Sequence, residues 1–299
     1  MGRAKTWLPG LLLVSPSIIL VGVFVYGLIG QNIWTSLNVS VNPVTDKVMN
    51  PGGYQNYVQL LSSTDYQHAL WNLLVLTVVF MTGTTFFGLL WSILLEKGVN
   101  GEGVFRSVYL YPMAVSFIAA GVVWRWLLSP AKDAGAIGLN QLLVKMGLPG
   151  LQSGWWSADS KFSMAAMALP AIWQLAGYVM ALFLAGFRGI SEDQREAARI
   201  DGAKEWQIYR YVLFPQLSPI ALSALIILGH MSMKMFDLIY AIAGANSYKA
   251  MVPATLMWTQ MFSQNDRVAA AVNATILLVL VAIVVVPYLI YTNKTEEGR

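Results

Sequence analysis

The sequence is poor in charge: only 11% of its 299 residues are Asp, Glu, Lys or Arg, while 57% are hydrophobic. Soluble domains carry about 25% charged residues. A chain with so few polar groups cannot cover its apolar interior with a polar surface, so part of its surroundings must be lipid. The composition therefore predicts contact with membrane lipid.

Cysteine is absent, and His68 and His230 are the two histidines. The lack of cysteine excludes disulfides, thiolate metal sites and cysteine nucleophiles, and it leaves the redox compartment open. The scarcity of histidine argues against a histidine-built metal cluster, so we expect no metal site. The net charge of +4 is small. Cytoplasmic loops of membrane proteins supply such an excess, so we expect no nucleic-acid partner.

The sequence also lacks the phosphate-binding pattern GxxxxGK[ST]. We therefore expect that this chain binds no ATP and no other cofactor itself. Paired acids, a nucleophile elbow and a metal cluster are missing as well, which disfavours a membrane-embedded enzyme. The absences together favour a binding or transport role.

Long apolar runs are what the sequence does have. A bilayer core about 30 Å thick needs about 20 apolar residues in a helix. The segments that qualify are Leu8–Ile33, Ala69–Leu95, Val108–Leu128, Phe162–Phe187, Ile220–Ala243 and Val268–Tyr291. The first follows a basic start, as in a signal peptide, but its run is longer than a signal peptide's, and no small-x-small cleavage pattern follows, so we interpret it as a retained helix. The pattern predicts an all-α integral membrane protein with six transmembrane helices.

The basic residues predict the orientation of these helices. With the N-terminus inside, the cytoplasmic segments hold eleven Lys and Arg, against seven on the other side. Those cytoplasmic segments are 1–7, 96–107, 188–219 and 292–299. The excess predicts that both termini are cytoplasmic and that the long loops 34–68 and 129–161 lie outside.

One polar segment interrupts the second half of the chain: SEDQREAARIDGAKEWQIYRYVLFPQLSP, residues 191–219. It contains strong helix formers and apolar residues at helical spacing. Ser191 is a candidate N-cap, and Gly202 would end a helix or let another surface approach closely. The segment predicts one or two short helices on the cytoplasmic face of the membrane. The alternative interpretation is a solvated amphipathic loop.

Within this segment, EAARIDGA followed by VLFP resembles the EAA loop of ABC importer permeases. Val212 and Phe214 replace the usual Ile and Leu of that loop, and Ser191 stands where a proline is common. The stretches WQLAGYVMALFLAGFRGI, FDLIYAIAG and VWRWLLSP are similar to binding-protein-dependent sugar permeases of the maltose and glycerol-phosphate uptake type. The resemblance covers about residues 67–290.

The resemblance implies a type I ABC importer transmembrane domain in a prokaryotic inner or plasma membrane, with a cytoplasmic coupling helix between spans four and five. Small residues in this loop would let an ATPase approach closely, and its carboxylates suit a basic partner. The residues implied in ATPase coupling are Glu196, Ala197, Ala198, Asp201, Gly202 and Pro215; Ala203 is a further small residue there.

The implied partners are two ABC ATPase subunits that bind ATP and Mg, a second related permease subunit, and a sugar-binding protein outside the membrane. The chain would then consist of an N-terminal helix with its outer loop (1–66), a transmembrane domain of five spans (67–291) and a cytoplasmic tail (292–299).

Polar residues also occur inside the predicted fifth span. His230, Lys234 and Asp237 are spaced to share one face of a continuous helix. They are interpreted either as a polar translocation path or as a Lys234–Asp237 ion pair that locks neighbouring helices. Asn72 is interpreted as a cap or a helix–helix hydrogen bond.

Extension from the loop places Tyr178, Met231, Ser232 and Met235 where maltose-type permeases line their sugar site. The full set of substrate-path residues is Trp173, Gln174, Tyr178, Met231, Ser232, Lys234, Met235 and Asp237. Packing between helices is the alternative interpretation for this set.

The function that follows is a permease subunit, and no enzyme, that translocates a mono- or oligosaccharide by alternating access. One alternative is a non-sugar solute such as a glycerol-phosphate. Another is an ion-coupled secondary carrier, which would usually have more spans arranged as inverted repeats.

Overall fold

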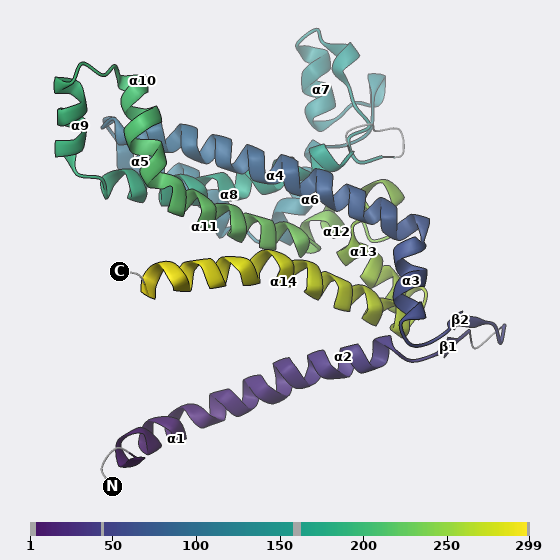
Figure 1. Ribbon diagram of the computed structural model, residues 1–299. Coiled ribbons are helices and arrows are strands. Elements are labelled where there is room, and N and C mark those ends of the chain that lie inside the picture. The colour runs from purple at the N-terminus through teal and green to yellow at the C-terminus, as the bar shows by residue number, and fades with distance from the viewer. Residues whose placement is uncertain (1–3, 43–44, 158–162, 298–299) are drawn as a thin grey trace. The chain divides into compact units, whose positions relative to one another are not determined.

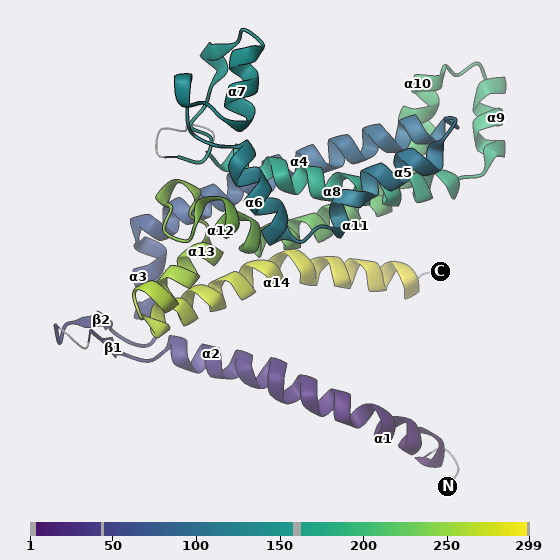
Figure 2. The same cartoon turned by 180° about the vertical axis from the view of Figure 1, so that it is seen from behind.

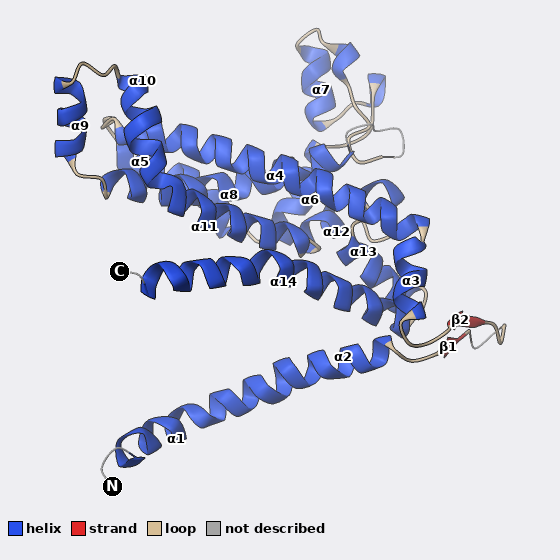
Figure 3. Ribbon diagram, viewed as in Figure 1, coloured by secondary structure: helices blue, strands red, loops and turns tan. Residues whose placement is uncertain are grey.

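Helices dominate the computed structural model, which describes residues 4–42, 45–157 and 163–297 (Figure 1, Figure 3). The helices are α1 (Ala4–Val21), α2 (Leu28–Ser36), α3 (Gln55–Ser62), α4 (Thr64–Glu96), α5 (Glu102–Leu110), α6 (Phe117–Leu127), α7 (Gly138–Lys145), α8 (Ser163–Arg188), α9 (Glu192–Ile200), α10 (Glu205–Ile208), α11 (Phe214–Met233), α12 (Asp237–Ala243), α13 (Pro253–Trp258) and α14 (Arg267–Glu297). An antiparallel hairpin pairs β1 (Ser40–Val41) with β2 (Val48–Asn50). The predicted start of the fourth span at Phe162, the basic residue Lys161 and the extreme ends of the chain lie outside the described residues.

The chain divides into two compact units. The smaller contains residues 1–67 and 257–279, and the larger contains residues 68–256 and 280–299. In the smaller unit, the Asn32 side chain of α2 donates to the carbonyl of Ala271 in α14 at 3.1 Å. The Asn50 amide of β2 contacts both carboxylate oxygens of Asp266 at 2.8 Å. The three-part division drawn from the sequence stays a prediction.

Five helices among the described residues are long and apolar enough to cross a membrane. They are Leu12–Ser36, Thr64–Glu96, Ser163–Arg188, Glu205–Met233 and Arg267–Ile290. A sixth candidate is a bent pair, Glu102–Ala114 with Phe117–Leu127. The prediction of an all-α membrane fold is thus confirmed, and the described residues contain the predicted six spans when the bent pair is counted as one span.

The third span, predicted over Val108–Leu128, is not one continuous helix, because this region bends by 97° between α5 and α6. Pro112 has no N–H to donate to the preceding turn. Ser116 then starts α6 as an N-cap, and its side chain accepts from the backbone of Ala119. The Gln174 side chain of α8 donates to the freed carbonyl of Val115. These contacts satisfy backbone hydrogen-bonding groups at the break, as irregular backbone at membrane depth requires.

The predicted fifth span, Ile220–Ala243, is also corrected. The helical segment begins at Glu205, passes through a π-helical turn at Tyr209–Leu213 and ends at Met233. Pro215 follows directly, and its ring would crowd the carbonyl of Tyr211 in a regular α-helix. A wider π turn relieves that contact. Because the backbone breaks after Met233, α12 is a separate short helix.

Helix α8 lies at the core of the larger unit, and 72% of the residues in its apolar 18-residue stretch are buried. Small residues let other helices approach it closely. A Cβ on Gly177 would lie 1.9 Å from the carbonyl oxygen of Tyr109 in α5. A Cβ on Gly88 of α4 would lie 2.7 Å from a methyl carbon of Val179. Such small-residue contacts are typical of packing between membrane helices.

Segments assigned to the same side of the membrane meet within the larger unit. Helices α5, α9 and α10 gather at one end of α4 and α8 (Figure 1, Figure 2). There, Arg188 pairs with Glu102 at 2.6 Å. Toward the opposite end, the Asn72 amide donates to the carbonyl of Met251 at 2.8 Å, as a tie from α4 to a loop. The grouping agrees with the predicted topology, and which side is cytoplasmic stays a prediction.

A labelling experiment checks the orientation. Because the chain has no cysteine, single cysteines report without background. Glu205 and Lys132 are both exposed, so both thiols should be accessible from their own side. In intact cells, a membrane-impermeant thiol reagent should label Lys132→Cys and spare Glu205→Cys, which should react after permeabilisation. Labelling of the residue 205 cysteine alone from outside would invert the topology.

Candidate functional site

The loop between α8 and α11 is a helix–turn–helix. Ser191 occupies the N-cap position of α9 with an extended backbone, although its side chain makes no capping hydrogen bond. The helix ends where Gly202 takes a φ of +80°. The N–H of Gly202 donates to Arg199, and the N–H of Ala203 donates to Ala198, each at 3.0 Å. These two bonds form a Schellman motif, which favours glycine at this position. The predicted short helices and the stop at Gly202 are therefore present.

The outer surface of this loop is exposed in the chain. Glu196, Ala197, Asp201 and Gly202 are all exposed. Beside them, Ile200 is 86% exposed, a high value for a large apolar side chain. The loop therefore presents acidic, small and apolar groups together on one outward surface.

The loop's small residues differ in exposure. Ala198 and Ala203 are partly buried and pack against the chain's own core, and the role of Ala198 in coupling stays a prediction. Ala197 and Gly202 remain on the outer surface. Pro215, also predicted to act in coupling, is exposed in the first turn of α11.

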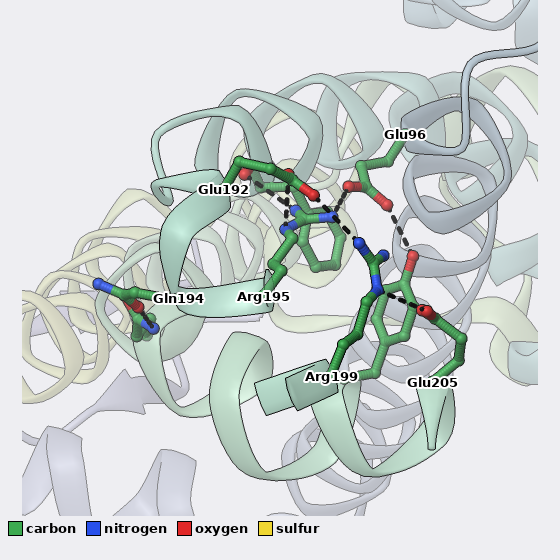
Figure 4. Close-up of polar contacts among 9 residues, drawn as sticks. Glu96, Glu192, Gln194, Arg195, Arg199 and Glu205 are labelled. Carbon is green, nitrogen blue, oxygen red and sulfur yellow. Dashed lines mark hydrogen bonds and ion pairs between the residues drawn. The ribbon is translucent and has the colours of Figure 1, made fainter. Parts of the chain in front are cut away.

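The inner side of α9 carries a buried polar cluster that sequence reasoning missed (Figure 4). Arg195 pairs with Glu96 at the end of α4, and the side chain of each is 10% exposed. The Tyr209 hydroxyl donates to the other Glu96 oxygen at 2.6 Å. Arg195 also donates to the carbonyl of Phe187 at 3.3 Å. Removing one member of a buried ion pair typically costs about 3–5 kcal/mol, so this cluster strongly restrains the loop.

A second set of ion pairs lies on the solvent side of α9. Arg199 contacts Glu205 at 3.1 Å and Glu192 at 3.4 Å, with 47–63% of these side chains exposed. The hydrogen bond to Glu205 raises the pKa of Arg199 above its usual value. Exposed pairs of this kind contribute little stability. The buried cluster therefore contributes more to the stability of the loop than the exposed pairs do, although both are arginine–carboxylate contacts.

Four of the predicted substrate-path residues line one pocket of about 220 Å³. They are Met231, Lys234, Met235 and Asp237, and the other lining residues are Phe117, Phe236 and Leu238. The pocket lies at the break between α11 and α12, because Lys234, Met235 and Phe236 form the connection between these helices.

The same break corrects the expectation for His230, Lys234 and Asp237. They do not share one helical face, because Lys234 follows the end of α11 and Asp237 starts α12. In the described part of the chain, no ion pair joins Lys234 to Asp237. The ion-pair lock is therefore not formed, and the two side chains lie exposed at the pocket.

The other predicted substrate-path residues lie outside that pocket. Ser232 is buried, and its hydroxyl is bonded to Thr77 at 2.9 Å and to the Gly229 carbonyl at 2.7 Å. Gln174 supports the break in the third span. The Trp173 ring lies 6.1 Å from that of Trp124, and Tyr178 is partly buried against the core. Each of these four side chains therefore has a contact within the chain, and their role in the substrate path stays a prediction.

Comparison with known proteins identifies the relatives of the chain. Residues 85–292 match the family described as binding-protein-dependent transport system inner membrane component. A protein of Pyrococcus horikoshii named "Probable ABC transporter permease protein" is 36% identical, with 96% of each chain covered. The xylose/arabinose import permease protein XacH of Haloferax volcanii is 35% identical over 80% of this chain and 74% of its own length.

A solved structure shares the fold. A chain of a bacterial alginate ABC transporter, determined in complex with an alginate pentasaccharide-bound periplasmic protein, matches with a TM-score of 0.77. The match covers 95% of this chain and 93% of that chain at 19% identity. At this identity the likeness concerns the arrangement of the helices.

Proposed function

This chain belongs to the family of binding-protein-dependent transport system inner membrane components, and we propose that it is the permease subunit of an ATP-driven importer for a mono- or oligosaccharide. Relatives named as sugar permeases support the carbohydrate class. In this function the chain moves the solute by alternating access and carries out no chemistry on it.

The outward surface of the α9 loop is the observation that carries the proposal. Ile200 and Trp206 are 86% and 57% exposed in the most polar segment of the chain. Exposed apolar groups that are interspersed with carboxylates fit a protein partner. We assign the surface formed by Glu196, Ala197, Ile200, Asp201 and Gly202, called the docking surface below, to an ATPase subunit.

Through the docking surface, the permease receives the energy of ATP hydrolysis from its ATPase partners. Two ATPase subunits bind ATP and Mg, and their closure moves α9. A second, related permease subunit forms the other half of the pathway, and a binding protein delivers the solute on the outer side. The pocket at the α11–α12 break is assigned to the solute path, because Lys234 and Asp237 supply polar groups there, beside the apolar walls of Met231, Met235 and Phe236.

Energy coupling tests this function. With ATP held constant, uptake of radiolabelled mono- and disaccharides from a panel should be insensitive to a protonophore. Uptake should also stop when the ATPase subunit that co-purifies with this chain carries a catalytically inactivating substitution. A secondary carrier behaves in the opposite way, so uptake that persists with the inactive ATPase and fails with the protonophore would refute the importer.

A further inference from the structure

The Glu96 carboxylate holds both arms of the α9–α10 loop. One of its oxygens pairs with Arg195 in α9, before the Gly202 turn. The other accepts from the Tyr209 hydroxyl at 2.6 Å, after that turn. Glu96 and Arg195 are 99 residues apart in the sequence. The three residues Glu96, Arg195 and Tyr209 are called the Glu96 clasp below (Figure 4).

One end of each of three membrane helices, α4, α8 and α11, lies near the Glu96 clasp. Glu96 is the last residue of α4, and Tyr209 begins the π turn that leads into α11. Phe187 lies in the last turn of α8, is fully buried and packs edge-on against Tyr209, with the ring centroids 5.9 Å apart. Its carbonyl accepts from Arg195. The clasp therefore joins the loop to α4 and α8 as well as to the helix that follows it.

Helix α9 separates the clasp from the docking surface by the width of one helix. Glu196 is exposed, whereas its neighbour Arg195 is buried on Glu96. Consecutive residues on a helix project about 100° apart, so one short helix can contact a partner outside and α4 inside. A movement of α9 that kept the ion pair intact would move the end of α4 with it.

We propose that Glu96 is a positioning residue that transmits movement of the docking surface into α4, a role that rests on the proposed ATPase coupling. Chain connectivity passes the movement of α9 to α8 and α11 alone. The clasp adds α4 as a third rigid connection. In this arrangement α4 and α9 move as one body during the transport cycle.

The chemistry of the clasp requires a carboxylate at position 96. Its two oxygens serve the guanidinium and the phenol at the same time. Glu96→Gln keeps the shape and one acceptor but removes the negative charge, which leaves the buried Arg195 guanidinium with only the exposed Glu192 carboxylate, 3.7 Å away, as a counter-charge. Tyr209→Phe removes one of the two contacts and keeps the ring against Phe187, so it should loosen the clasp less.

The test uses the complex purified through a tag on this chain, with the subunits that co-purify, reconstituted in proteoliposomes. Glu96→Gln should retain the ATPase subunits, while solute imported per ATP hydrolysed falls at least about fivefold, the lower end of typical coupling between sites. Tyr209→Phe should lower the same ratio by a smaller factor. A purely structural role would reduce the amount of complex and leave this ratio unchanged.

Spin labels on Phe86→Cys in α4 and Asp193→Cys in α9 measure the rigid connection directly. Both positions are exposed, and the chain has no native cysteine. Without further substitution, the distance distribution between the labels should be narrow and the same with and without ATP. In the Glu96→Gln background it should broaden and change on ATP binding.

Glu102→Gln is the matched control, because Glu102 also joins two helices through an arginine at the same end. That pair is 26% and 48% exposed, so its loss should leave import per ATP within about twofold of wild type. Unchanged import per ATP and an unchanged narrow distance in Glu96→Gln would overturn the proposal. If Glu96→Gln does not accumulate, an unchanged ratio in Tyr209→Phe overturns it. A wild-type complex without any ATPase subunit would instead refute the proposed function.

Discussion

Glu196→Lys and Gly202→Asp should each abolish uptake while the permease stays in the membrane at normal amounts. Both residues are exposed on the docking surface and outside the membrane-spanning segments. Membrane insertion and helix packing should therefore survive the changes. We expect weak retention of the ATPase subunit on co-purification together with lost uptake.

The two substitutions should weaken ATPase binding for different reasons, charge repulsion for Glu196→Lys and added bulk with backbone strain for Gly202→Asp. Glu196→Lys places a like charge against a basic partner, and such a mismatch in an interface costs several kcal/mol. Gly202→Asp places a side chain where close approach is needed. It also puts a Cβ on a backbone with φ +80°, which costs about 1 kcal/mol or more for an L-residue. Apart from the neighbouring residues in the chain, no described atom lies within 4 Å of that Cβ, so the added side chain would extend into open space at the proposed docking surface.

Gly98→Asp is the matched control for Gly202→Asp. Gly98 has a φ of +75°, and a Cβ there also meets nothing within 4 Å. The backbone strain and the added charge are therefore the same, but Gly98 is outside the docking surface. We expect Gly98→Asp to retain the ATPase and to transport. If Glu196→Lys and Gly202→Asp behave like this control, the docking assignment is wrong.

The spans could be predicted because the physics behind them is local. A run of about 20 apolar residues has to form a helix in lipid, whatever surrounds it. The helix end at Gly202 could be predicted for a similar reason, since a left-handed backbone position favours glycine. Both signals lie within a single stretch of sequence.

The breaks in the third and fifth spans could not be predicted from the sequence. Pro112 lies inside an apolar run, and membrane helices tolerate proline without breaking. The Gln174 side chain of α8 donates to the Val115 carbonyl and so stabilises the bend. In the fifth span, residues 231–243 contain neither proline nor glycine, and Lys234 and Asp237 are spaced as on one face of a continuous helix, so the sequence shows no helix stop at Met233. The bend in the third span is thus stabilised by a contact between helices that are distant in the sequence, and one sequence carries no direct sign of such a contact.

The sequence contains one indication that Glu96 has a charged partner. Glu96 is an acid at the C-terminal end of α4, where the helix dipole is negative, and the last turn contains no basic residue. An acid in that place needs a positive partner. The sequence offers several arginines in the polar loop, and only the folded chain identifies Arg195. The sequence could therefore predict the need for a partner and not its identity.

Gly177→Val should prevent this chain from accumulating as a folded membrane protein. A Cβ at Gly177 would lie 1.9 Å from the carbonyl oxygen and 2.5 Å from the carbonyl carbon of Tyr109. Both are backbone atoms, so no side-chain rotation can relieve the overlap, and α5 would have to leave α8. Overpacking commonly costs about 1–3 kcal/mol, and a clash with backbone should reach the upper end of that range or exceed it.

Gly103→Val separates this clash from the general effect of valine in a membrane protein. Gly103 is an exposed helical glycine in α5, and a Cβ there meets nothing within 4 Å. Membrane-inserted amounts and the aggregation temperature in detergent should match wild type for Gly103→Val and drop sharply for Gly177→Val. The Gly177 contact joins α5 to α8, so Gly177→Val should lower the amount of folded permease directly. The permease that remains should also fail to retain the ATPase subunit. Equal abundance and heat stability of the two valine variants would show that α5 and α8 are not packed through Gly177.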